Sequence, residues 1–403
     1  MKASAASRAQ ADNNIWEQQS DYFPTLSLTA QDGRLCFNDK TTRALTASRG
    51  AASSWMGEGR VTLVQPLFNG FSTWNRVHSA KELYSAANYD LAGTAEDVAM
   101  RAVRAHLNLM RTKEMLGLAN QFLSDIQARR QNIAMMVKGG AADEAELLQA
   151  DEMQTIVKNA RFGYEESFRQ AEADYIEVAG APPAEALALG EPNWNAFIPP
   201  ALEDSVASAV KGNPRILAAN RVAASLLRMT NAEKASLAPQ LNAEMSYMKQ
   251  DQLDIVGGET SNAQAMLKLA WNFSTGGGQF ARIQKTQQQQ VESAAKRQGV
   301  MRIIERDVRQ KYSSMLIVDQ QYDLLAGRES SSKKILDNFT AQFEGGKQSN
   351  LQLIAAHSKL FDARAALTDA RYRQMLSRFE LLNAMGALRE AFGVAKIGLS
   401  QKG

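Results

Sequence analysis

The 403-residue sequence predicts an α+β fold of two tandem repeats, each a β-hairpin followed by a long α-helical coiled-coil hairpin. Three observations support this prediction. Two long stretches lack proline and are rich in helix-forming residues, four segments of about ten residues alternate apolar with polar side chains, and glycines recur between the two halves at a constant offset.

Proline is absent between Pro66 and Pro182 and again after Pro239. Proline costs about 3 kcal/mol inside a helix, so these gaps permit very long helices. We predict helices over residues 71–138 and 278–343, each on the order of 100 Å long. Apolar residues in the second recur at a spacing near 3.5, which is typical of a coiled coil: Met301, Ile304, Val308, Tyr312, Met315, Val318, Tyr322 and Leu325.

Both long helices run into a pair of glycines, Gly139–Gly140 and Gly345–Gly346. Glycine just past the last helical residue is a common helix stop, because it adopts the left-handed conformation easily. Returning helices are predicted over residues 143–180 and 348–388. Each half of the chain is therefore predicted to form a long helical hairpin.

The two halves align at one offset. Adding 206 takes Gly70 to Gly276, and the same shift relates the Gly-Gly turns and the glycines that end the returning helices. The predicted organisation is as follows: repeat 1 over 1–180 (helix end 1–21, strands 22–32 and 58–69, hairpin 70–180), a linker over 181–200, repeat 2 over 201–388 (helix 201–236, strands 238–249 and 262–273, hairpin 275–388), and a tail over 389–403.

The four predicted strands have the length and the two-residue alternation of strands that span an outer membrane. Aromatic residues gather at their helix-side ends, as an interfacial girdle would: Tyr22, Phe23, Phe68, Phe71, Trp74, Trp271 and Phe273. Four strands cannot close a barrel, and open sheet edges are not tolerated in lipid, so several chains would share one barrel. Amphipathic hairpins on a soluble domain would show the same alternation.

Composition excludes several other classes of protein. The 46 basic and 43 acidic residues nearly balance, which argues against the concentrated basic face of a nucleic-acid binder. Cys36 is the only cysteine and the three histidines are scattered, so we predict no metal site, no cofactor and no enzymatic activity. No run of about 18 apolar residues is present, so no transmembrane helix is predicted.

Two glycine-containing stretches, LFNGFSTWNR over 67–76 and WNFSTGGGQFAR over 271–282, occupy matching places in the repeats. The second could cradle a phosphate at a helix N-terminus. It lacks the GxxxxGK[ST] pattern, however, and its counterpart has only Gly70. We therefore interpret Gly70 and Gly276 as joints between a strand and a helix.

The order of these elements resembles the TolC family of outer-membrane efflux and secretion channels. The resemblance rests on PTLSL, PQLNAEM, the two strand–helix joints, KGGAADEAELLQADEM, EGGKQSNLQLIAAHSKLFDARAAL, GNPRILAANRVAASLLR and LLNAMGAL. It implies a homotrimer with a twelve-stranded β-barrel in outer-membrane lipid and a periplasmic α-helical tunnel. It also implies a passive exit duct for efflux or type I secretion, served by a periplasmic adaptor (membrane fusion protein) and an inner-membrane pump of the ABC or RND type. A soluble coiled-coil scaffold or a periplasmic adaptor is the alternative.

The resemblance also implies where the periplasmic entrance lies: Asp143, Glu146, Gln348, Gln352 and Ala355, with the partner helices docking at the Gly-Gly turns. The family's gate aspartates match Gln352 and Ala355, and neither is acidic. Acidic residues lie instead on the first hairpin, where Glu146 aligns with Gln352 across the repeat. We therefore predict a pore less cation-selective than an aspartate-gated one.

The start of the chain departs from the family pattern. The segment before residue 15 has no apolar core of a signal peptide. The alignment of the repeats places Met1 opposite Ile216, so counterparts of residues 200–215 would lie upstream. We therefore expect a chain that is N-terminally truncated or read from a misassigned Met.

Overall fold

The computed structural model describes residues 1–37, 52–184, 190, 192–252, 258–273, 275–345 and 347–394. Gly346, one of the predicted turn residues, lies outside these ranges. The chain forms two compact units. The sheet unit comprises Lys2–Asn88 and Ala218–Gln298, and the hairpin unit comprises Met1, Tyr89–Leu217 and Gly299–Gly403.

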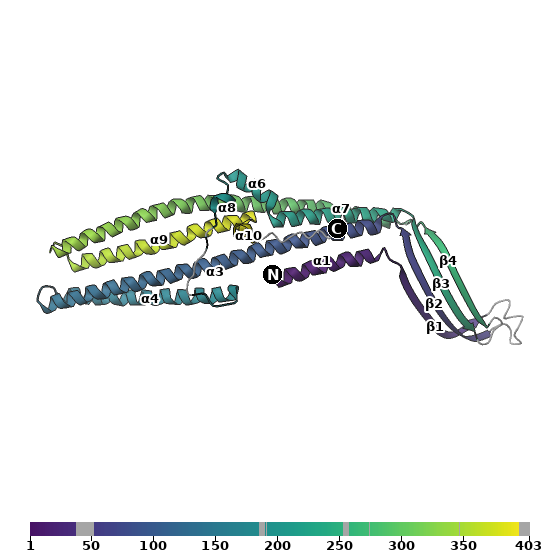
Figure 1. The fold of residues 1–403 in the computed structure, drawn as a ribbon, viewed down its shortest axis with the longest axis horizontal. Helices are drawn as coiled ribbons and strands as arrows, with labels where there is room; N and C mark the ends of the chain where they lie inside the picture. The colour runs from purple at the N-terminus through teal and green to yellow at the C-terminus, as the bar shows by residue number, and fades with distance from the viewer. Residues whose placement is uncertain are drawn as a thin grey trace. The chain divides into compact units, whose positions relative to one another are not determined.

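The sheet unit contains one four-stranded antiparallel sheet in the order β1-β2-β3-β4 (Figure 1). Its strands are β1 (Thr25–Phe37), β2 (Ala52–Phe68), β3 (Gln240–Gln252) and β4 (Glu259–Ala270). The register aligns the alternating apolar residues on one face, which is exposed in the single chain. This apolar face includes Leu26, Leu28, Val61, Met245, Tyr247, Leu267 and Leu269.

The opposite face of the sheet is polar. Arg60 pairs with Glu58 at 2.9 Å, and Lys268 pairs with Glu244 at 2.6 Å. Between these two pairs, the Gln264 amide donates to the Ser246 hydroxyl at 3.0 Å. The predicted division of the strands into an apolar and a polar side is therefore present in the fold.

The strands are displaced from their predicted bounds of 22–32, 58–69, 238–249 and 262–273. The first hairpin extends further toward its loop, because β1 and β2 stay paired as far as Phe37 and Ala52. At the other end β4 stops at Ala270, and Trp271 turns out of the ladder to donate its indole N–H to the Leu237 carbonyl at 3.0 Å. Pairing with the neighbouring strand, rather than local alternation, sets these limits.

The predicted helix over 201–236 is wrong as a single element. It consists of α6 (Leu202–Gly212) and α7 (Pro214–Lys234), followed by a 3₁₀ turn over Ala235–Leu237. Asn213 between them is extended, with φ −65° and ψ 123°, and its side-chain oxygen accepts the Arg215 N–H at 2.9 Å. An asparagine cap followed by proline at the first helical position starts a new helix. The predicted helix end over 1–21 corresponds to α1 (Lys2–Ser20).

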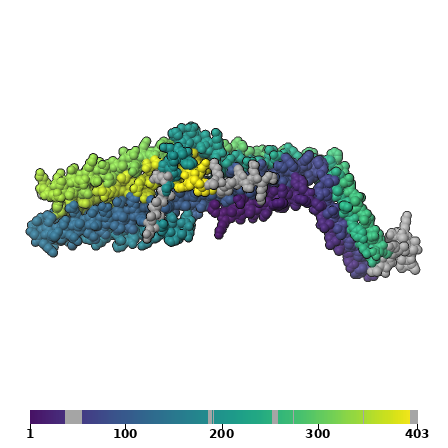
Figure 2. Space-filling view, in the orientation of Figure 1, coloured from purple at the N-terminus to yellow at the C-terminus, as the bar shows by residue number. Residues whose placement is uncertain are grey.

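Two helical hairpins of matching lengths form the body of the hairpin unit, although the first parts of α3 and α8 belong to the sheet unit. Helices α3 (Ser72–Lys138) and α8 (Gly278–Glu344) have 67 residues each, and α4 (Glu144–Ala179) and α9 (Asn350–Met385) have 36 each. Figure 2 shows the α8–α9 hairpin lying along the α3–α4 hairpin in this unit.

The predicted coiled-coil stripe of α8 is confirmed where the helix is covered by its neighbours. Ile304, Val308, Tyr312 and Met315 are buried against α6 and α9. A second cluster joins α3 to α9 around Phe379, which is fully buried and packs its ring against Trp194 of α5 (Trp194–Phe197). The short α10 (Leu388–Ala391) buries Leu388 in the same cluster. Among the described residues, no helix has both the length and the apolar character needed to cross a membrane.

Candidate functional site

The first hairpin turns at the predicted glycines. The Gly139 N–H donates to the Met135 carbonyl, and the Ala141 N–H donates to the Met136 carbonyl at 2.8 Å. Gly140 has φ +72°, the left-handed conformation that this helix end requires. The second turn has the same hydrogen bond across five residues, since the Lys347 N–H donates to the Gln342 carbonyl at 2.9 Å. Each tip therefore has the same closing hydrogen bond, and we call residues 139–146 and 345–352 the hairpin tips.

Four of the five predicted entrance residues lie at these tips, and Ala355 lies three residues further along α9. Asp143 precedes α4 and is exposed, and its side chain makes no capping bond. Gln348 donates its side-chain amide to Gln342 at 3.0 Å. Gln352 and Ala355 are exposed on α9, on the face opposite the buried Leu353 and Ile354. A face of α9 without acidic groups at these two positions is therefore available to line a passage.

Sequence reasoning missed the residue that joins the two tips. Asn350, the first residue of α9, is buried with 5% of its surface exposed. Its side-chain amide donates to Glu146 Oε2 at 3.3 Å and lies 3.7 Å from the Met136 sulfur. The predicted entrance residue Glu146 is therefore held by the second hairpin. The only local signal was the position of Asn350 just after the second turn.

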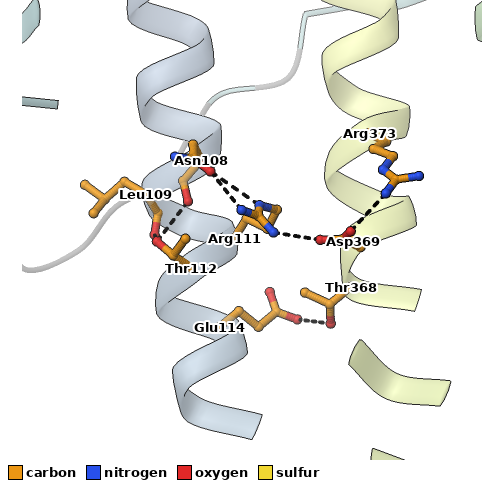
Figure 3. A network of polar contacts seen from close by, with 8 residues as sticks. All are labelled: Asn108, Leu109, Arg111, Thr112, Glu114, Thr368, Asp369 and Arg373. Atoms are coloured by element: carbon orange, nitrogen blue, oxygen red, sulfur yellow. Dashed lines mark hydrogen bonds and ion pairs between the residues drawn. The ribbon is translucent and has the colours of Figure 1, made fainter. Parts of the chain in front are cut away.

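A series of polar contacts continues from the tips along the antiparallel helices α3 and α9, and we call these contacts the α3–α9 rungs. Arg111 of α3 donates to Asp369 of α9 at 2.8 Å, and Arg373 donates to the other oxygen of Asp369 at 3.1 Å (Figure 3). Glu114 accepts from Thr368 at 3.2 Å and from Tyr372 at 3.0 Å, and it also contacts Arg371. Arg111, Asp369 and Glu114 are about one-third exposed and Arg373 is more exposed still, so each pair stabilises the contact only modestly.

Further from the tips, the Glu380 carboxylate of α9 forms ion pairs with two basic side chains. Arg104 of α3 lies 2.7 Å and Lys311 of α8 lies 2.5 Å from its oxygens. Burial alone would raise the pKa of Glu380, but the bonds from Lys311 and Arg104 hold it below its ordinary value. This rung stays charged at neutral pH and ties α9 to both long helices.

The strand–helix joints are not identical in detail. Gly70 has φ +67°, and a side chain there would collide with Ala238 and the Ala235 carbonyl, at 2.6 and 2.7 Å. Gly276 has open space around it, and the positive φ falls on the next residue, Gly277. The residue that matches Gly277 is Phe71, also with positive φ, whose ring packs edge-on against Phe68 at 5.6 Å. Close packing thus makes glycine necessary at Gly70 but not at Gly276.

The described part of the chain holds no group of three or more His, Cys, Asp or Glu side chains that could bind a metal ion. The contacts described above hold helices together and do not form a reactive site. Two helical hairpins are joined at their tips by Asn350 and along their length by polar rungs that are about one-third exposed. Such contacts can break and re-form at low cost, because water replaces the lost hydrogen bonds.

Comparisons with known proteins agree with this fold. Residues 206–387 match the model of the family described as outer membrane efflux protein. Over 335 residues the chain is 22% identical to the outer membrane efflux protein BepC of Brucella suis, an alignment that covers 81% of this chain and 72% of that protein.

Two solved structures share the fold. A membrane protein from Pseudomonas aeruginosa superposes with a TM-score of 0.79 at 16% identity, covering 95% of this chain and 89% of that one. The outer membrane protein VceC of Vibrio cholerae gives 0.77 at 14% identity, with coverages of 95% and 92%. The fold is therefore that of an outer-membrane channel protein. Residues 206–387 carry the sequence pattern of the outer membrane efflux protein family. The relative BepC and the structural neighbour VceC are both named as outer membrane proteins.

Proposed function

We propose that the protein is the exit duct of a tripartite efflux or type I secretion system. Three copies supply four strands each to a twelve-stranded barrel, and their helical hairpins form a periplasmic tunnel. The duct is passive, since an inner-membrane pump of the ABC or RND type supplies the energy and a periplasmic adaptor docks at the Gly-Gly turns. Two tandem repeats in each chain, over 1–180 and 201–388, give the ring its internal symmetry.

One observation carries this proposal. The apolar face of the sheet carries exposed apolar side chains on all four strands, with Leu28 at 76% and Leu267 at 71%. A continuous apolar surface of this size is costly in water but favourable in lipid. The opposite face is polar, as the wall of a water-filled passage requires.

Fractionation of the full-length protein tests the proposal. We expect recovery in outer membranes as a trimer that dissociates to monomers only on heating. Recovery as a soluble monomer would contradict it and would favour the alternative of a coiled-coil scaffold or periplasmic adaptor.

We further propose that Glu146 supplies the acidic character of an entrance whose matching gate residues, Gln352 and Ala355, are uncharged. Block of the current by divalent cations in a planar bilayer should be weaker than a ring of aspartates would give. Glu146→Gln should reduce the remaining block severalfold, because the amide removes one carboxylate per subunit.

Glu144→Gln is the matched control for this change. Glu144 lies in the same first turn of α4 but is exposed, whereas Glu146 is part-buried. Equal loss of block in both variants would show that general surface charge, and not Glu146, attracts the cations.

A further inference from the structure

One of the α3–α9 contacts has a chemistry different from the rest. His357 of α9 is largely buried, with 13% of its side chain exposed, and its Nδ1 lies 4.0 Å from Asp125 Oδ2 of α3. The ring borders a cavity of about 20 Å³ whose lining residues all come from α3 and α9, among them Phe122, Leu360 and Phe361. Its Nε2 is buried without a hydrogen-bond partner. The imidazole therefore lies between α3 and α9, beside apolar side chains and beside the charged Asp125 and Arg364.

The charged groups around His357 come from three helices. On α3, Asp125 attracts a protonated imidazole and Arg129 repels it. On α9 itself, Arg364 also repels it, and this arginine is paired with Glu329 of α8 at 3.2 Å. A proton on His357 would thus add a third positive charge to Arg129 and Arg364, next to the acidic groups of Asp125 and of Glu329, which is already paired with Arg364.

We propose that His357 is a proton-sensitive contact between the hairpins: the neutral ring holds α9 against α3, and protonation releases α9 and favours an open entrance. The inference rests on the proposed function, because it assumes that separating the hairpins opens the passage of the proposed duct. It differs from the charged rungs at Asp369 and Glu380, since those contain no histidine, the side chain whose charge changes between pH 5 and 8.

The sign of the pH dependence follows from the surroundings of the ring. Burial first, and then the charge of Arg129, lower the pKa of His357 below its ordinary value of about 6.5, and Asp125 offsets only part of this. In an open state the ring is solvated and its pKa returns toward that value. The open state therefore binds protons more tightly, and opening becomes more favourable as the pH falls below about 6.5. Each unit of difference in pKa favours opening up to tenfold per subunit.

Single-channel recording of the purified full-length protein in planar bilayers tests the proposal. Wild type should open severalfold to tenfold more often at pH 5.5 than at pH 7.5. His357→Gln, which is neutral at both values, should stay at the pH 7.5 level, and His357→Arg should be open at both. His106→Gln is the matched control, because His106 is a part-buried histidine of α3 and its loss should leave the response intact.

Two results would overturn the proposal: no pH response in wild type, or a full response in His357→Gln. If His357→Gln fails to form trimers, an NMR titration of His357 in wild type replaces it, and a midpoint at or above 6.5 would contradict the proposal. Failure of the proposed function looks different, since wild type would then form no channels at any pH and would not be recovered as a trimer.

Discussion

Replacing Gly386 with alanine should lower the free energy of unfolding by about 2–5 kcal/mol. Gly386 ends α9 with φ +76°, a conformation that costs an L-residue roughly 1–2 kcal/mol. A Cβ atom there would lie 2.6 Å from Pro214 Cδ and 3.1 Å from Asn213 Cα. Overpacking of this kind costs about 1–3 kcal/mol more. Asn213 is also bound to the end of α9, because its side-chain amide donates to the Ala384 carbonyl at 2.9 Å.

Gly180→Ala is the matched control. Gly180 ends α4 with φ +72°, and nothing lies within 4 Å of the position its Cβ would take. Only the conformational cost of about 1–2 kcal/mol applies. Denaturant unfolding of both variants in detergent should separate them by at least 1 kcal/mol. Equal losses would show that Asn213 and Pro214 shift away freely.

Replacing Met245 with arginine should prevent recovery of the protein in outer membranes. Met245 lies near the middle of β3 on the apolar face and is 58% exposed. An arginine facing lipid near the midplane of a barrel costs about 2–4 kcal/mol, and a trimer carries three copies. The measurement is the fraction of chain found as a heat-modifiable trimer in the membrane.

Ser246→Arg tests the other face at almost the same depth. Ser246 is paired with Thr62 and Gln264 on the polar side of the sheet. An arginine there would face water in the barrel, so assembly should persist and only the conductance should change. If both variants assemble equally well, the apolar face does not contact lipid.

The helical hairpins were predictable because their signals are local. Absence of proline, a 3.5-residue spacing and paired glycines each act within one or two turns of the chain, and α3 and α8 end where Gly139 and Gly345 indicate. The sequence pattern that ends the helix at Asn213 is equally local. The prediction of one helix over 201–236 did not take into account that an asparagine cap is followed by proline.

The contacts of the site could not be predicted in the same way. Asn350 and Glu146 are more than 200 residues apart, and so are Arg111 and Asp369. Such pairs depend on how α3 and α9 pack, and nothing in the spacing along either helix identifies the partner. The same limit applied to β1, whose length depends on how far β2 stays paired with it.

The order of strands in the sheet leaves one edge of β1 and one edge of β4 without a partner among the described strands. In a closed ring each of these edges would be completed by another copy, so folding and assembly would be a single equilibrium. The midpoint of unfolding would then depend on protein concentration, and dilution alone would unfold the chain. Early in synthesis, when copies are few, the rate of maturation would be set by the encounter of subunits.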